Sequence, residues 1–172
     1  IGTDGLFPLQ VELLRRTGLS RRRGDPLVGR GSFLPGEGAQ AFLVERRSDA
    51  QARGARPRAV VAAVASASHQ KATLPALAKA LGRAVTAAAP EATARWISGN
   101  NGLTLLDRME ARLHATHLYL PQPRFPKLLW GEFCGVGGQL LAAALLEPAS
   151  SVLVTAPATM GAQWACRLDK VK

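Results

Sequence analysis

Residues 31–63 read GSFLPGEGAQAFLVERRSDAQARGARPRAVVAA, and the character of the chain changes several times within them. A glycine-rich turn comes first, and the apolar run AQAFLVE at 39–45 then predicts a buried strand. RRSDAQARG predicts a short helix that ends at Gly54, and RAVVAAVASAS at 58–68 predicts a second strand. A phosphate-binding turn opens a helix, whereas this turn precedes a strand. We therefore interpret it as a tight turn in which Gly36 and Gly38 adopt positive φ.

Helical and strand-like segments alternate along the rest of the chain. The clearest helix is expected over 73–90, where Thr73 can cap the first turn, Pro75 suits that turn, and one face is apolar (Leu74, Leu77, Leu81 and Val85). Further helices are expected over 6–18, 105–117 and 135–148, and further strands over 92–98, 117–123, 150–156 and 164–171. This order predicts a layered α/β fold with a largely parallel, buried sheet. Ligands of such sheets bind beyond the carboxyl ends of the strands, which points to the loops SGNNGLT (98–104), EFCGVGG (132–138) and TAPATMG (155–161).

The charge of the chain is strongly basic, with 22 Lys and Arg against 12 Asp and Glu and a net charge of +10. Such a surface attracts polyanions: nucleic acid, an anionic membrane surface, a phosphorylated cofactor or an acidic protein. Phe33 and Phe42 are the only aromatic residues between positions 8 and 95, so the Arg-rich first third lacks the aromatic residues typical of nucleic-acid binding. The absence of an apolar run of 18 residues argues against a membrane span. Cys134 and Cys166 suit reduced thiols in a cytoplasmic protein.

Two groups of reactive side chains deserve a hypothesis of their own. Cys134 comes directly before a predicted helix, whose N-terminus would lower the pKa of the thiol, but a nucleophile also needs a base and an oxyanion hole. A buried, packed cysteine is the simpler interpretation. His114 and His117 lie three residues apart on one predicted helix, yet no third ligand stands at a suitable spacing. We therefore expect solvent-facing histidines and no metal site.

In their order, these segments resemble the β-ketoacyl synthase family of the thiolase-like superfamily. SFLPGEGAQAFLVE, followed by AQARGARPRAVV, is similar to the family pattern GFVxGEGAxxLVLE…AxARGAxIxAxV. IGTDGLFP at 1–8 resembles the strand and turn after the nucleophile helix, and SVLVTAPATMGAQWACRLDK at 151–170 resembles the family's C-terminal segment. The resemblance implies a layered thiolase-like α-β-α-β-α fold. Residues 1–63 would then end its N-terminal half, 64–172 would form its C-terminal half, and the nucleophilic cysteine would lie upstream of Ile1.

The sequence departs from this family at the catalytic positions. Asp107 and Glu110 match the D-P-x-E helix start, but the histidine of the preceding HGTGT-like loop falls on Gly99. The second histidine, from a K-S-x-x-G-H-like motif, is expected within WGEFCGVGG (130–138), which contains neither His nor Lys. Thr159 replaces the ring that gates the acyl pocket. In the family the two histidines polarise the thioester carbonyl and stabilise the enolate. Their loss implies a non-condensing subunit similar to chain-length factors.

This resemblance sets out what the protein is expected to do. It implies a subunit of a type II fatty-acid or polyketide synthase that pairs with an active ketosynthase, or with a missing N-terminal half, and shapes the acyl tunnel. An acyl carrier protein would bring the acyl group on its phosphopantetheine arm, and no cofactor would be bound by the chain itself. The expected pocket residues are Gly99, Asn100, Asn101, Val136, Gly137 and Thr159.

Two other functions remain open at this stage. One is an active acyltransferase or ketosynthase that uses an upstream nucleophile, with Asn100 or Asn101 as oxyanion donors and Cys134 as a further candidate. The other is a basic nucleic-acid-binding module. Under every hypothesis we expect the chain to need another segment to cover exposed sheet edges and apolar helix faces.

Overall fold

The structure is a computed structural model that describes residues 2–4, 8–17, 33, 35–132, 136–159 and 161–171. Its helices and strands follow the predicted alternation in most places. In chain order they are β1 (Gly2–Asp4), α1 (Pro8–Arg16), β2 (Gly38–Gln40), α2 (Arg47–Ala52), β3 (Ala59–Ser68), α3 (Leu74–Ala88), β4 (Arg95–Ser98), α4 (Thr104–Thr116), β5 (Pro123–Arg124), α5 (Lys127–Trp130), α6 (Val136–Leu146), β6 (Ser151–Ala156) and β7 (Ala162–Lys170).

The main sheet has five strands in the order β3-β7-β6-β4-β5. β4 runs parallel to both β5 and β6, whereas β7 runs antiparallel to both β3 and β6. The sheet is therefore mixed, and the expectation of a largely parallel sheet is only partly met. The reason is the short link between β6 and β7, residues 157–161, because a parallel connection needs a crossover of a dozen or more residues.

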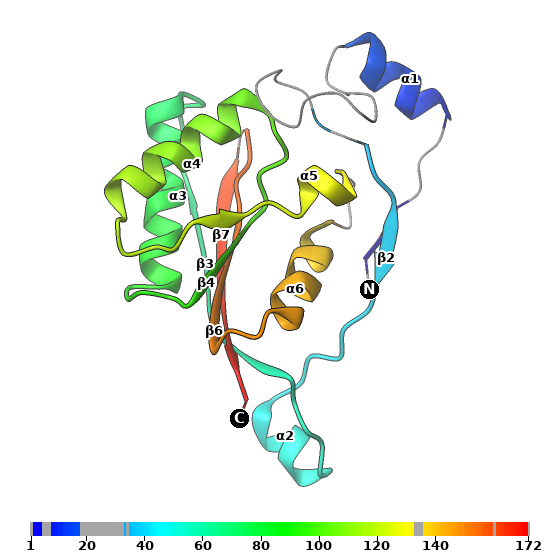
Figure 1. Cartoon of the computed structure of the whole chain (residues 1–172), viewed down its shortest axis with the longest axis vertical. Coiled ribbons are helices and arrows are strands. Elements are labelled where there is room, and N and C mark those ends of the chain that lie inside the picture. The colour runs from blue at the N-terminus through cyan, green and yellow to red at the C-terminus, as the bar shows by residue number, and fades with distance from the viewer. Residues whose placement is uncertain are drawn as a thin grey trace.

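The elements form layers around this sheet (Figure 1). α3 and α4 cover one face, where Leu77, Leu81 and Val85 of α3 join a core that includes Trp96 and Met109. α6 covers part of the other face, and the two-stranded sheet of β1 and β2 lies beyond α6. The expected α/β layering is confirmed. The division expected at 63/64 falls inside the continuous strand β3 and stays a prediction.

Helix α3 begins where the sequence predicts, but its cap differs in detail. Pro75 stands in the first turn, where its missing N–H leaves no intrahelical bond unmade. Thr73 occupies the N-cap position, yet its side chain makes no capping hydrogen bond. The predicted apolar face is buried at Leu77, Leu81 and Val85, with Leu74 partly buried against it.

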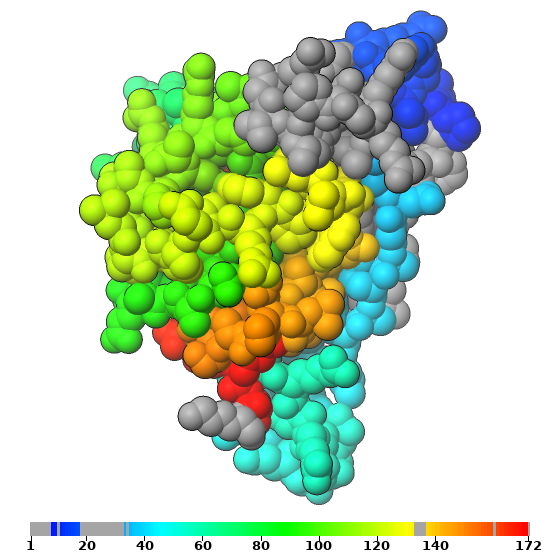
Figure 2. Space-filling model, in the orientation of Figure 1, coloured from blue at the N-terminus to red at the C-terminus, as the bar shows by residue number. Residues whose placement is uncertain are grey.

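Apart from Gln139, helix α6 contains only glycine and apolar residues, which is typical of a helix enclosed by other elements. Leu140 and Ala144 are buried against the main sheet. On the β2 side, a Cβ at Gly138 would lie 2.3 Å from Nε2 of Gln40, so the glycine allows the Gln40 side chain to pack directly against the α6 backbone. Figure 2 shows α6, in orange, open to solvent on one face of the molecule, and Leu146 at its end is 75% exposed.

Two of the expected strands are shorter than predicted. The strand expected over 39–45 is limited to Gly38–Gln40, which pairs with β1, and Leu43 and Val44 are exposed at 78% and 77%. The strand expected over 117–123 is reduced to β5, since a turn from His117 to Leu120 precedes it.

The GEGA turn also differs from its prediction. The described residues with positive φ are Gly54, Gly102, Gly131 and Gly161, so neither Gly36 nor Gly38 adopts that conformation. Gly36 is instead needed for close approach, because a Cβ there would lie 2.4 Å from the carbonyl oxygen of Trp130. Its N–H donates to the carbonyl oxygen of Glu132 at 3.0 Å. The turn is thus architectural and braces the segment that carries Glu132.

Within the described residues, no helix combines the length and the hydropathy needed to cross a membrane.

Candidate functional site

The loop between β4 and α4 is closed by its own asparagines. The Asn100 side-chain oxygen accepts from the N–H of Gly102 at 3.1 Å, and the Asn101 side-chain oxygen accepts from the N–H of Leu103 at 3.2 Å. Gly102 has a φ of 93°, which favours glycine because it has no Cβ. Both asparagines are buried, and their positions agree with the strand-to-loop junction expected here.

Gly99 lies against β6 with no space for a side chain. Its N–H donates to the carbonyl oxygen of Thr155 at 2.7 Å. A Cβ would lie 2.8 Å from that same oxygen and 3.1 Å from Cδ1 of Leu140. Real Cβ atoms do not approach backbone this closely, so a histidine at this position would require β6 to move. The catalytic position that the resemblance places on Gly99 is therefore closed by the fold.

An ion pair between a buried lysine and a half-buried glutamate lies beside this loop. Nζ of Lys127 donates to both carboxylate oxygens of Glu132, at 3.0 and 2.9 Å, and Nδ2 of Asn101 donates to Oε2 of Glu132 at 2.7 Å. Lys127 is only 8% exposed. Gly131, with a φ of 87°, turns the chain so that the two charged residues meet. The Glu132 carboxylate thus accepts three hydrogen bonds, two from Lys127 and one from Asn101.

The sequence contained a signal for this pair. The K-S-x-x-G-H motif places its lysine four residues before the glycine, and Lys127 stands four residues before Gly131 in KLLWGE. Aligned in this way, the lysine and the glycine match, and Glu132 takes the place of the histidine. The sequence prediction did not consider Lys127, because it examined positions 130–138 alone.

Glu110 on α4 is a second buried carboxyl group. One oxygen, Oε1, accepts from the hydroxyl of Ser98, while Oε2 has no hydrogen-bond partner among the described residues. Burial raises the pKa of Glu110 to about 7, and the nearby polar groups of Ser98, Asn100 and Thr155 only partly offset this. The group can therefore be either neutral or charged close to physiological pH.

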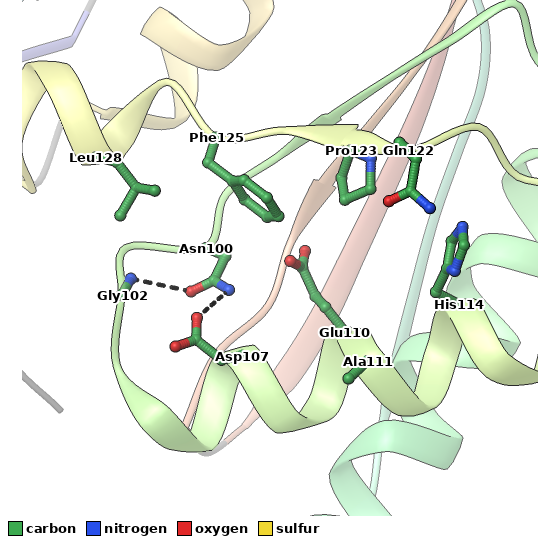
Figure 3. Close-up of a pocket in the computed structure, with 10 residues that line it drawn as sticks. All are labelled: Asn100, Gly102, Asp107, Glu110, Ala111, His114, Gln122, Pro123, Phe125 and Leu128. Carbon is green, nitrogen blue, oxygen red and sulfur yellow. Dashed lines mark hydrogen bonds between the residues drawn. The ribbon is translucent and has the colours of Figure 1, made fainter. Parts of the chain in front are cut away.

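A cavity of about 450 Å³ lies between α4 and the segment 122–128. Figure 3 shows Glu110 rising from α4 toward Pro123 and Phe125, with Asn100 and Asp107 to one side and His114 and Gln122 to the other. Nδ2 of Asn100 donates to Oδ1 of Asp107 in the wall of this cavity.

The other predicted site residues are more dispersed. Cys134 lies outside the described residues, and Val136 is the first residue of α6. Gly137 is exposed, and no atom lies within 4 Å of a Cβ built on it. Thr159 is exposed in the link between β6 and β7. The structure thus brings Asn101, at the end of the predicted group Gly99, Asn100 and Asn101, into contact with Glu132, whose pairing with Lys127 the sequence prediction left out.

His114 and His117 are half-buried and make side-chain contacts, whereas solvent-facing histidines were expected. The ring of His114 stacks on Trp96 with 6.3 Å between the ring centroids. His117 contacts Tyr119 and lies 3.1 Å from Oγ1 of Thr86. The two imidazole rings therefore contact different residues. In the part of the chain that the structure describes, no three His, Cys, Asp or Glu residues are grouped so that they could hold a metal ion.

Comparison with solved structures defines the class of fold. Three similar chains are a type II polyketide synthase acyl-carrier protein in complex with its ketosynthase bound to the hexaketide (16% identity, TM-score 0.79), the ishigamide ketosynthase/chain length factor (19%, 0.77) and the oxazolomycin ketosynthase domain of Streptomyces albus JA3453 (18%, 0.79). Each match covers 99% of this chain and 55%, 53% and 41% of the other, respectively.

The chain therefore has a ketosynthase-like fold and spans about half the length of the solved chains that it matches. This confirms the thiolase-like α/β fold implied by the sequence resemblance. Comparisons with protein-family models and with curated proteins give no match.

Proposed function

We propose that the chain belongs to a non-condensing, chain-length-factor-type subunit of a type II fatty-acid or polyketide synthase. The observation that carries this proposal is the Lys127–Glu132–Asn101 cluster, in which a paired carboxylate stands at the position of a catalytic histidine. The closed position at Gly99 supports it, because a histidine has no space there.

The chemistry of condensation explains why these two features matter. Decarboxylation of a malonyl thioester develops negative charge on the thioester oxygen, and hydrogen-bond donors must be aimed at that charge. Removal of one such donor costs about 100- to 1,000-fold in rate. Here one position is glycine and the other a carboxylate, which accepts hydrogen bonds and repels an enolate. Lys127 does not replace the donors, because its ammonium group is already bound to Glu132.

The expected partners follow from the same proposal. The protein would bind an active ketosynthase subunit, or the N-terminal half of its own fold, and would contact an acyl carrier protein that holds the acyl chain on phosphopantetheine. A net charge of +10 would steer an acidic carrier protein toward it. The open face of α6 supports a need for further protein on that side, because several of its apolar residues are only partly buried and Leu146 is exposed (Figure 2).

The alternative of an acyltransferase with asparagine oxyanion donors receives less support. Nδ2 of Asn100 donates to Asp107, and Nδ2 of Asn101 donates to Glu132, so each amide already has an anionic acceptor. Each amide therefore keeps only one N–H for an oxyanion, and the neighbouring carboxyl group disfavours a second negative charge beside it. An active enzyme of this kind would also become acylated by an acyl thioester, which intact mass spectrometry detects.

The test is a condensation assay with malonyl and acyl carrier protein, using the full-length protein alone and together with an active ketosynthase. We expect no condensation by the protein alone, and a change in product length when it is added to the ketosynthase. Glu132→His is expected to stay inactive, because the donor at Gly99 is still missing. Glu12→His, at an exposed position on α1, is the matched control. Condensation by the unmodified protein alone at a ketosynthase-like rate would overturn the proposal.

A further inference from the structure

The cavity beside α4 combines acidic groups with an apolar wall. Its lining includes the carboxyl groups of Asp107 and Glu110, and the facing wall is formed by Pro123, Phe125 and Leu128 (Figure 3). No lysine or arginine is among the described residues that line it. In a chain with a net charge of +10, this local reversal of sign points to a ligand of positive charge.

Glu110 supplies the second, independent indication of a ligand. The residue is 4% exposed, and its Oε2 lacks a hydrogen-bond partner among the described residues. A buried carboxyl oxygen without a partner is costly, because the group has lost its hydration without a replacement. The side chain rises from α4 toward Phe125, so its carboxyl group lies on the cavity side of the helix (Figure 3). A donor placed in the cavity would satisfy it.

The other candidate occupants fit these walls less well. A metal ion would need several ligating groups, and the described residues offer no group of three suited to one. An anion would be repelled by Asp107 and Glu110. A neutral apolar molecule would fit the wall at Phe125 but would leave Oε2 of Glu110 without a partner.

We propose that the cavity between α4 and the segment 122–128 binds a small organic cation, namely a primary ammonium group on an apolar body. The ammonium group donates to Glu110, and Asp107 adds a second negative charge. The apolar body packs against Pro123, Phe125 and Leu128, where the Phe125 ring can also attract the cation. The inference does not depend on the proposed function, because the cavity does not include Lys127 or Glu132.

The experiment compares two probes of the same shape, benzylammonium and benzyl alcohol, by calorimetry on the full-length protein. A charge-assisted hydrogen bond distinguishes them, so we expect benzylammonium to bind about 10-fold tighter or more. Glu110→Gln keeps the shape of the side chain and removes its charge. It is expected to weaken benzylammonium binding by a similar factor, while binding of benzyl alcohol stays unchanged. Glu12→Gln, at an exposed ion pair on α1, is the matched control.

A second variant tests the location without changing Glu110. Ala111 lines the cavity from α4, and Ala111→Leu adds bulk to that wall while keeping a good helix former. It is expected to weaken the binding of both probes. Equal affinity of the unmodified protein for the two probes, absence of benzylammonium binding, or full binding to either cavity variant would each overturn the proposal.

Discussion

Replacement of Glu110 by glutamine is expected to change how the free energy of unfolding depends on pH. The carboxyl group is buried on α4, and burial raises its pKa from an ordinary value of 4.5 to about 7. In the unfolded chain the same group is hydrated, so it loses its proton near the ordinary value. Over the interval between these two pKa values, the folded protein holds one proton more than the unfolded chain.

The sign and the magnitude follow from proton linkage. A group whose folded pKa is raised contributes stability that is fully present below pH 4.5 and is lost as pH rises through about 7. The difference between the two values corresponds to about 3 kcal/mol. The free energy of unfolding should therefore fall by about 3 kcal/mol relative to Glu110→Gln as pH rises from about 4.5 to about 8, because the glutamine cannot ionise.

The assay is urea unfolding of the full-length protein at a series of pH values across this interval. Glu12→Gln, which removes an exposed carboxyl group on α1, is the control, and its curve should run close to that of the unmodified protein. Parallel pH profiles for the unmodified protein and Glu110→Gln would refute the reasoning. They would mean that Glu110 titrates alike in the folded and the unfolded chain.

Three further substitutions test other parts of the structure by urea unfolding. Gly99→Ala should lower the free energy of unfolding by about 1–3 kcal/mol, because its Cβ would lie 2.8 Å from a β6 carbonyl oxygen. Gly137→Ala is the control, since the space there is open, and it should be neutral or stabilising. Equal effects of the two substitutions would contradict the packing at Gly99. Lys127→Met should cost about 2–3 kcal/mol, less than in a fully buried pair, because Glu132 is half-buried and keeps its hydrogen bond from Asn101. The further change Glu132→Met should recover part of this loss, and no recovery would argue against the ion pair. Thr73→Ala should cost less than about 0.5 kcal/mol, since its side chain caps nothing; a loss above about 1 kcal/mol would reveal a cap.

The regular elements of the main layers could be predicted because local pattern and burial agree there. In α3 the apolar positions recur at helical spacing, and the sheet they contact lies within the same chain. The run at 39–45 has equally apolar residues, yet Leu43 and Val44 are exposed. An apolar pattern indicates that a segment tends to be buried, but a strand also needs a neighbouring strand for its backbone, and the local pattern does not show where that neighbour lies.

The site was predictable where it depends on residues close together in the chain. Asn100 and Asn101 follow β4 directly, so their place at a strand end was readable from the sequence. The contact between Asn101 and Glu132 was not, because it joins two loops that only the folded sheet brings together. Glu110 was recognised from a motif, but its unpartnered oxygen depends on the cavity around it, which no local pattern encodes.

The interior position of β7 in the main sheet has a consequence for the order of folding events during synthesis. β7 is the last described strand along the chain, yet it lies between β3 and β6, and its register joins Ala59 to Lys170. Until the ribosome has released these residues, β3 has no hydrogen-bonding neighbour in the main sheet, and its apolar residues stay incompletely buried. Such non-local pairing slows folding and prolongs the exposure of aggregation-prone surface. A chaperone that holds the nascent chain would thus have most to protect just before translation of β7 is complete.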